Sequence, residues 1–259
     1  HALWTFRSGD LSGLLTRPYA HDEEVVVGSL DGELRALDRA TGAPRWSLPD
    51  LPTETGMART GDYLIVATTT RKLVAVDLTK HTIAVAATLP TGVRGSVQVR
   101  GSTVLCTTDD SRVLAFSLPN LQPLWQRDLP GWGELSSTCG EQSLFVADER
   151  GHLAALEVDT GNVTWQQARE GETFGAPILD GEAVLLGSAQ EIRRFAAADG
   201  VERPGIRQTE EAWSEAPTKV GQRLFCPTRD GSIRVVDLAT SVPLYRIEGG
   251  KRGVRVLAL

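Results

Sequence analysis

Methionine and cysteine are scarce in this chain of 259 residues, which contains one methionine and three cysteines. The cysteines Cys106, Cys139 and Cys226 form neither a disulfide framework nor a zinc-binding spacing, so we expect small, buried apolar residues. No apolar run approaches the roughly 18 residues that a membrane-spanning helix needs, so we expect no transmembrane segment. Excess positive charge is lacking too, because 27 Lys and Arg stand against 33 Asp and Glu, and this argues against a nucleic-acid partner.

Catalytic motifs are also missing. The sequence contains no G-x-S-x-G, no H-E-x-x-H and no phosphate-binding P-loop. Three of the four histidines, His21, His81 and His152, fall at or beside predicted turns, where we expect them to be solvated rather than to act as bases or metal ligands. The sequence therefore predicts a protein that is not an enzyme, with no catalytic residue, no bound metal and no cofactor.

What the chain does contain is a repeat. Its 26 glycines and 13 prolines punctuate the whole length, which is typical of many short elements joined by tight turns. An apolar residue, here called the anchor, recurs in a similar context at steps of 39, 40, 40, 39 and 41 residues. The anchors are Leu34, Leu73, Val113, Leu153, Ile192 and Ile233.

Each repeat is predicted to hold four short strands, which in the first repeat cover about 13–20, 23–30, 33–39 and 43–48. Glycines such as Gly32 supply the positive φ of the hairpin turns. Four-stranded units of about 40 residues indicate an all-β fold, a β-propeller of four-stranded antiparallel blades. We expect one domain over 1–259, with blades at about 13–50, 53–89, 92–129, 133–169, 173–208 and 212–249.

The two ends add a part of a repeat. Residues 1–8 contain a segment that looks like a fourth strand, and residues 251–259 one that looks like a first strand. These terminal strands either pair as a partial seventh blade or extend a six-bladed ring. A third interpretation is that the chain is a fragment of a larger protein.

One motif within the repeat is specific. Residues 36–46 follow the pattern A-x-D-x-x-T-G-x-x-x-W, and residues 155–165 repeat it with Glu157 in place of the first Asp. This pattern resembles the PQQ-type propeller repeat. The resemblance implies that the Trp docks on a neighbouring blade while the Asp and Thr-Gly shape a turn. The docking position, twelve residues after the anchor, holds Trp46, Trp125, Trp165 and Tyr245, whereas Val85 and Pro204 should lack the contact.

The PQQ-type repeat occurs in quinoprotein alcohol dehydrogenases, in the BamB outer-membrane assembly lipoprotein and in sensor domains of some bacterial Ser/Thr kinases. Dehydrogenase activity would imply a bound quinone, Ca²⁺ and an adjacent Cys-Cys pair, which this chain lacks. We therefore expect a non-enzymatic scaffold that binds a protein or peptide partner. The alternative is a small-molecule sensor for a PQQ-like ligand in a larger bacterial receptor or kinase. The resemblance implies the bacterial envelope or periplasm, while three unpaired cysteines also suit the cytoplasm.

The expected binding surface is a rim formed where chain segments lead into the first strands of the blades. Repeat arithmetic places chemically diverse side chains there, and aromatic anchors with a few charges are typical of a recognition surface. The rim residues are Arg94, Trp132, Glu134, Phe174 and Trp213. Two alternatives remain open: the two tryptophans pack inside loops, or Arg94 and Glu134 form a salt bridge.

Overall fold

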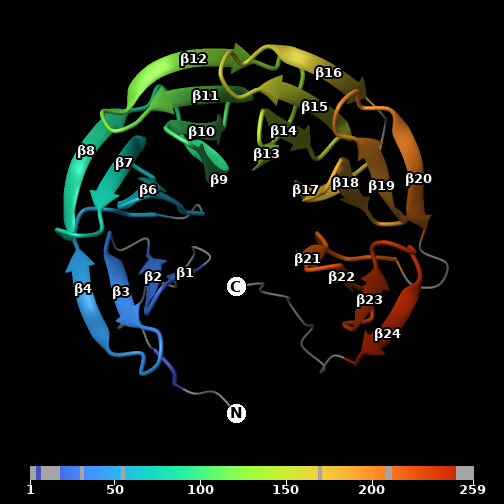
Figure 1. Ribbon diagram of the computed structural model, residues 1–259, viewed down its shortest axis with the longest axis horizontal. Coiled ribbons are helices and arrows are strands. Elements are labelled where there is room, and N and C mark those ends of the chain that lie inside the picture. Colours follow the sequence, from blue (N-terminus) through green and yellow to red (C-terminus); the bar gives the residue numbers. More distant parts are fainter. Residues whose placement is uncertain are drawn as a thin grey trace. The chain divides into compact units, whose positions relative to one another are not determined.

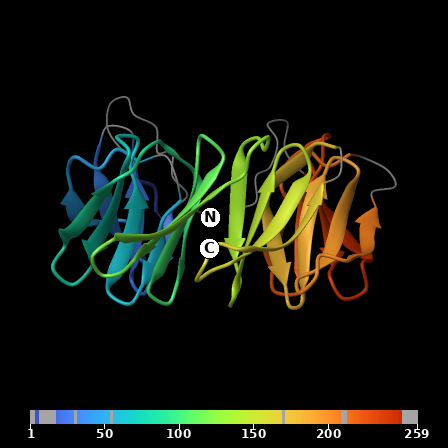
Figure 2. The same cartoon turned by 90° about the horizontal axis from the view of Figure 1, so that it is seen from above.

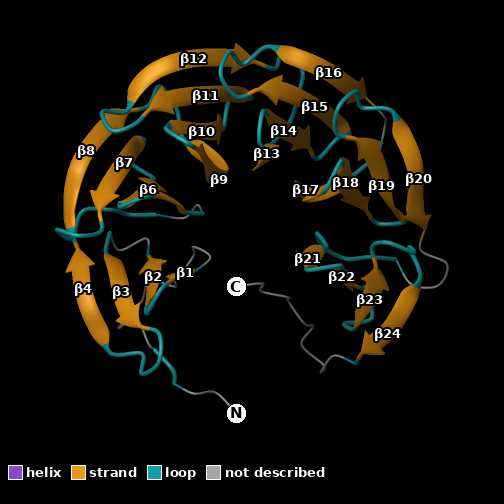
Figure 3. Ribbon diagram, viewed as in Figure 1, coloured by secondary structure: helices purple, strands orange, loops and turns teal. Residues whose placement is uncertain are grey.

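The computed structural model describes residues 4–6, 18–29, 32–53, 56–168, 171–207 and 212–248. All regular secondary structure within these ranges is β-strand (Figure 3), which confirms the predicted all-β class. None of these residues belongs to a helix capable of crossing a membrane. The predicted terminal strand at 251–259 lies outside the described residues, and only 4–6 of the predicted strand at 1–8 are described.

The chain packs as two compact units, which are described separately. Unit 1 takes in the described part of residues 1–131 together with 158–161, and unit 2 takes in the described part of the rest. Unit 1 contains three antiparallel sheets in which neighbouring strands follow one another along the chain (Figure 1). The strands of blade 1 are β1 (Tyr19–His21), β2 (Glu24–Gly28), β3 (Leu34–Asp38) and β4 (Pro44–Leu48). Those of blade 2 are β5 (Ala58–Thr60), β6 (Tyr63–Ala67), β7 (Lys72–Asp77) and β8 (Thr82–Thr88). Those of blade 3 are β9 (Val93–Arg100), β10 (Thr103–Thr108), β11 (Arg112–Ser117) and β12 (Gln122–Asp128).

Unit 2 contains three sheets of the same topology. The strands of blade 4 are β13 (Leu135–Cys139), β14 (Ser143–Asp148), β15 (His152–Glu157) and β16 (Val163–Ala168). Those of blade 5 are β17 (Thr173–Asp180), β18 (Ala183–Ser188), β19 (Glu191–Ala196) and β20 (Glu202–Arg207). Those of blade 6 are β21 (Thr218–Val220), β22 (Arg223–Pro227), β23 (Ile233–Asp237) and β24 (Pro243–Ile247). Four-stranded antiparallel meanders of this kind are the blades of a β-propeller, as the repeat predicts.

The two middle strands of each blade form the core. In blade 3 every residue of β10 is buried, because both faces of the sheet are covered by side chains. In the fourth strands β8 and β12 exposed residues alternate with half-buried ones towards the strand end, since each strand is the outer edge of its sheet. Figure 2 shows the strands of each unit running between two ends, where the hairpin turns lie. One sheet cannot cover its own two faces. Apolar side chains from adjacent sheets of the same unit bury them.

The turn between the third and fourth strands follows the PQQ-type motif. In blade 1 the carboxylate of Asp38 accepts hydrogen bonds from the backbone N–H and the hydroxyl of Thr41, both at 2.8 Å. These bonds and one from Arg45 hold the pKa of Asp38 down at about 2. The turn ends on Gly42, whose φ of +74° suits glycine.

Three indole rings dock on such turns. Trp125 donates from Nε1 to the carbonyl of Val158 at 2.9 Å, and Trp165 donates to the carbonyl of Ala197 at 2.9 Å. Trp4, close to the N-terminal end of the chain, does the same to Arg39 at 2.9 Å. The ring of each lies against the glycine of its turn, so residues 4–6 contribute a docking Trp of the kind that a fourth strand carries.

The other docking positions differ. Trp46 stacks on His81, with ring centroids 5.1 Å apart, because blade 2 has His81 where the motif has glycine. Val85 is half-buried and packs in the apolar cluster that contains Leu121, so an aliphatic contact replaces indole docking there. Tyr245 does not dock within the described residues: its ring is 45% exposed and faces Arg223 of its own blade.

Candidate functional site

Blade 4 departs from the other blades at the turn between its second and third strands. Five residues before the anchor, most blades carry a hydroxyl whose oxygen donates to a backbone carbonyl and so closes the turn. These residues are Ser29, Thr68, Thr108 and Thr228. In blade 4 the position is Asp148, at the end of β14. A carboxylate there keeps the turn and adds a negative charge.

The Asp148 side chain is fully buried, at 0% exposure. Its Oδ1 accepts the backbone N–H groups of His152 at 2.9 Å and Arg150 at 3.1 Å, and its Oδ2 accepts the backbone N–H of Gly133 at 2.9 Å. The ring nitrogen Nδ1 of His152 lies 2.7 Å from Oδ2, a charge-assisted hydrogen bond. Every carboxylate oxygen is thus occupied, as a buried charge requires.

These donors set the protonation state of the carboxyl. Burial on its own raises the pKa of Asp148, but hydrogen bonds from the Gly133 N–H and from the ring and backbone of His152 outweigh burial and leave the pKa below its ordinary value. Asp148 is therefore an anion at neutral pH. Because Nδ1 of His152 donates to this anion, the tautomer of the neutral ring carries its proton there.

The imidazole of His152 supports an aromatic residue. Trp132 stacks on it with ring centroids 5.0 Å apart and an angle of 20° between the planes. Trp132 is half-buried, and the His152 side chain is 29% exposed. We call Trp132, His152 and Asp148 the Trp–His–Asp cluster. It is a stack at the surface, with a buried charge behind it.

The segment 131–134 that carries Trp132 is fastened to the same turn twice. Besides the bond from Gly133 to Asp148, the backbone N–H of Glu134 donates to the Glu149 carboxylate at 2.6 Å. A Cβ at Gly133 would meet the Glu149 carboxylate, which would have to move away and give up its place beside this segment. These contacts position Trp132 with little freedom to move.

Phe174 follows a residue, Thr173, that is hydrogen-bonded to the turn of the cluster. The neighbouring Thr173 donates from Oγ1 to the backbone carbonyl of Asp148 at 2.5 Å and so ties the start of β17 to the β14–β15 turn. Phe174 itself is half-buried in β17, opposite Gly187 of β18. Unit 2 thus holds three residues of the predicted rim, Trp132, Glu134 and Phe174, in segments joined to one turn.

The remaining rim residues lie elsewhere. The prediction that Trp213 lies on the rim is wrong. Trp213 is 2% exposed and packs in the core cluster with Leu185 and Leu224, where the whole indole is removed from water and more apolar area is buried than at a surface. Arg94 belongs to unit 1, where it pairs with Asp109 of its own blade at 3.1 Å.

Sequence reasoning missed two members of the cluster. Asp148 stands out once the residues five before each anchor are compared, since four blades carry a hydroxyl there, blade 5 has Gly187, and only blade 4 has a charged side chain. His152 was expected to be solvated, which is wrong, because it is held between Trp132 and Asp148. His81 is exposed, as expected, and stacks on Trp46, whereas the His21 side chain is 12% exposed beside two carboxylates and is not freely solvated.

The cluster combines an aromatic stack at the surface with a buried carboxylate. An Asp–His pair can serve as a general base when a nucleophile lies beside it, but within the described ranges no serine or cysteine hydrogen-bonds to His152. The described residues also hold no group of three His, Cys, Asp or Glu side chains arranged for a metal ion. Cys106 and Cys226 are free and buried, and burial raises the pKa of both thiols to about 12.

Comparison with known proteins gives one consistent family. A family model described as outer membrane protein assembly factor BamB matches residues 30–138 and 122–240. BamB of Burkholderia pseudomallei is 23% identical over 241 residues, which is 85% of this chain and 62% of that protein. BamB of Bordetella pertussis is 27% identical over 169 residues, 63% of this chain and 44% of that protein. The chain spans less than two thirds of the length of these curated relatives.

Solved structures agree on the fold. The crystal structure of BamB from Moraxella catarrhalis matches with a TM-score of 0.74 and 19% identity, over 96% of this chain and 80% of that one. The computationally designed Ika8 protein matches with a TM-score of 0.70 and 14% identity, over 97% and 92% of the two chains. At these identities the likeness concerns the fold.

Proposed function

Because the chain belongs to the family of the outer membrane protein assembly factor BamB, we propose that it is a non-enzymatic propeller scaffold that binds a protein partner during outer-membrane protein assembly. This setting would place it in the bacterial envelope. The proposal rests on the family match over most of the chain, together with a site that has the chemistry of recognition.

The partner-binding surface that we propose is centred on the Trp–His–Asp cluster. The single observation that carries it is the stack of Trp132 on His152, backed by the buried Asp148. A half-exposed indole in a fixed orientation gives a large contact area without loss of side-chain freedom on binding, which is why Trp is common among the residues that dominate interface energies. Phe174 and Glu134 extend this surface with a second ring and a charge.

Blade 4 is where such a surface is expected to arise. A blade that served only to hold the fold would be well served by threonine at position 148, as blades 2, 3 and 6 are. Asp148 and His152 maintain that turn and also support an aromatic side chain at the surface. The additional groups have a purpose if Trp132 must be presented rigidly to a partner.

The experiment places a photo-crosslinking benzoylphenylalanine at position 132 in cells that make the protein, followed by identification of the crosslinked protein. The captured protein is then purified, and its affinity is measured for the unmodified chain and for Trp132→Ala combined with Phe174→Ala. We expect the double variant to bind at least about tenfold more weakly, with a Tm only a few degrees lower, because the lost stack on His152 contributes about 0.5–1.5 kcal/mol.

The matched control is His81→Ala. It removes a second Trp–His stack, that of His81 on Trp46, which lies beside a third-to-fourth-strand turn rather than at the proposed surface. It should leave the affinity unchanged. Equal affinity of the double variant and the unmodified chain would show that this surface does not bind the partner.

A further inference from the structure

The Trp–His–Asp cluster lies in a strongly acidic part of unit 2. Residues 131–134, 148–152 and 171–174, which carry the cluster and Phe174, are joined by hydrogen bonds at the β14–β15 turn. These segments hold four carboxylates and one guanidinium, a formal charge of −3, which is half of the −6 of the whole chain. The carboxylates are Glu134, Asp148, Glu149 and Glu172, and the guanidinium is that of Arg150. Negative charge is therefore concentrated around the stacked indole.

Three of these carboxylates are at the surface. Glu134 and Glu172 are exposed, and the Glu149 side chain is 48% exposed. The backbone N–H of Glu134 donates to the Glu149 carboxylate at 2.6 Å. The N–H of Thr173, which follows Glu172, donates to the Glu149 carbonyl at 3.1 Å. Arg150, with its Nε 3.6 Å from the Glu149 carboxylate, is the one guanidinium in the three segments, so it cannot neutralise all of them.

The indole of Trp132 is the flat group in this acidic setting. His152 covers one face of the half-buried ring, so a partner can reach only the opposite face and the edges. Behind the stack, the buried Asp148 anion accepts a hydrogen bond from Nδ1 of His152 at 2.7 Å and polarises the imidazole. The face of an aromatic ring carries partial negative charge, and among aromatic side chains Trp attracts cations most strongly. The ring and the charges around it thus favour the same kind of group, a cation.

We propose that this surface binds an arginine side chain of the protein partner, with the guanidinium stacked on Trp132 and paired with the surrounding carboxylates. The inference rests on the proposed function and names the chemistry of the residue that is recognised. Arginine is favoured over lysine because its planar guanidinium can stack on an indole while its N–H groups pair with a carboxylate, whereas an ammonium is a compact and strongly hydrated charge.

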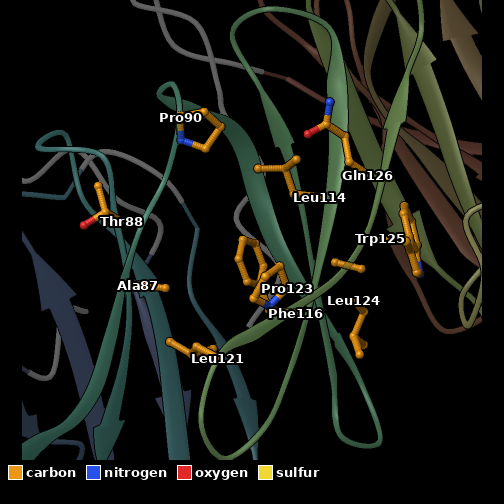
Figure 4. Close-up of a pocket in the computed structure, with 11 residues that line it drawn as sticks. Ala87, Thr88, Pro90, Leu114, Phe116, Leu121, Pro123, Leu124, Trp125 and Gln126 are labelled. Atoms are coloured by element: carbon orange, nitrogen blue, oxygen red, sulfur yellow. The ribbon is translucent and has the colours of Figure 1, made fainter.

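Two other surfaces lack this combination. The second Trp–His stack, that of Trp46 on His81, is flanked in the chain by two cations, Arg45 and Lys80. The groove between β8 and β12 of unit 1 is lined by residues without charge, and its wall residue Phe116 already packs in the core (Figure 4). Charge complementarity therefore favours the surface on blade 4 for a cationic side chain.

The test is a titration of the whole chain in 0.1 M salt with two peptides that differ only in charge. One is acetyl-Gly-Arg-Gly-Arg-Gly-amide, and the other has citrulline, the uncharged isostere, in place of both arginines. NMR of the indole N–H groups follows binding, with the Trp132 signal assigned from Trp132→Leu. We expect the arginine peptide to shift that signal with a Kd on the order of millimolar, and the citrulline peptide to bind at least about tenfold more weakly.

Glu134→Gln combined with Glu172→Gln removes two exposed carboxylates, and it should weaken binding of the arginine peptide by about threefold or more. The matched control is Glu141→Gln combined with Glu182→Gln, which removes the same charge at the β13–β14 and β17–β18 turns. The length of β14 separates those turns from the β14–β15 turn by roughly 17 Å. The control should leave the affinity unchanged, because charges more than about 10 Å apart are largely screened at this salt concentration.

Equal affinity for the two peptides, no saturable shift of the Trp132 signal, or an unchanged affinity in the Glu134 and Glu172 variant would each overturn the arginine proposal. The proposed function is tested separately, by the affinity of the captured partner for Trp132→Ala combined with Phe174→Ala. If those two substitutions weaken the partner while the arginine and citrulline peptides bind equally, the scaffold function stands and the arginine proposal fails.

Discussion

Gly200 lies directly against the indole of Trp165, so that a Cβ atom on Gly200 would meet Cε3 of that ring at 2.5 Å. The backbone of Gly200 also has a φ of +70°, which L residues with a side chain rarely adopt. One glycine thus meets two separate requirements of the repeat: it closes a turn and admits a neighbouring Trp.

Gly200→Ala should destabilise the protein by about 2–5 kcal/mol, because about 1–2 kcal/mol of backbone strain adds to about 1–3 kcal/mol of overpacking against Trp165. Gly221→Ala is the matched control, since Gly221 has a φ of +57° but no atom within 4 Å of the added Cβ. It should cost only the backbone strain. Urea unfolding of both variants measures the difference, and equal losses would contradict the docking role of Gly200.

The charge of Asp148 should make part of the stability depend on pH. Its pKa is lower in the folded chain than the ordinary 3.8, so its ionisation favours the folded state above that value and the contribution is lost as pH falls through the folded pKa. Asp148→Thr restores the residue of blades 2, 3 and 6 and removes this effect. The free energy of unfolding of the unmodified chain should therefore fall more steeply than that of Asp148→Thr between pH 5 and pH 2. Parallel curves would contradict it.

His152→Ala should cost more than the loss of a ring stack. It removes a donor from the buried Asp148 carboxylate, a loss of about 1–3 kcal/mol, in addition to the contact with Trp132. His81→Ala removes only a stack on Trp46, and aromatic pairs contribute about 0.5–1.5 kcal/mol. Urea unfolding at pH 7 should rank His152→Ala as the more destabilised variant. The reverse order would show that the Asp148 bond contributes little.

Thiol reactivity should separate the three cysteines. Because burial raises the pKa of Cys106 and Cys226 to about 12, their thiolate fraction at pH 8 is negligible, whereas Cys139 is only half-buried. A disulfide reagent such as Ellman's should label Cys139 alone in the native protein and all three cysteines in denaturant. Cys139→Ser should abolish the native reaction. More than one reactive thiol in the native unmodified chain would contradict the burial of the other two.

The blade architecture could be predicted from the sequence because it depends on local signals. Apolar runs such as the one at β10 and glycines such as Gly42 recur at a fixed spacing, and they specify strands and turns without reference to distant residues. The site was harder to predict. Trp132 was expected at a surface, but its support by His152 and Asp148 depends on how segment 131–134 folds over the β14–β15 turn.

Two tryptophans with similar sequence surroundings illustrate the boundary between sequence and structure. Trp132 and Trp213 both precede first strands, yet Trp132 is half-buried at the surface while Trp213 is in the core. The sequence by itself determined the strand pattern and the turn chemistry, because these follow from spacing along one chain. Only the tertiary structure decided which indole is presented and which carboxylate is buried beneath it, since burial depends on side chains contributed by another segment of the chain.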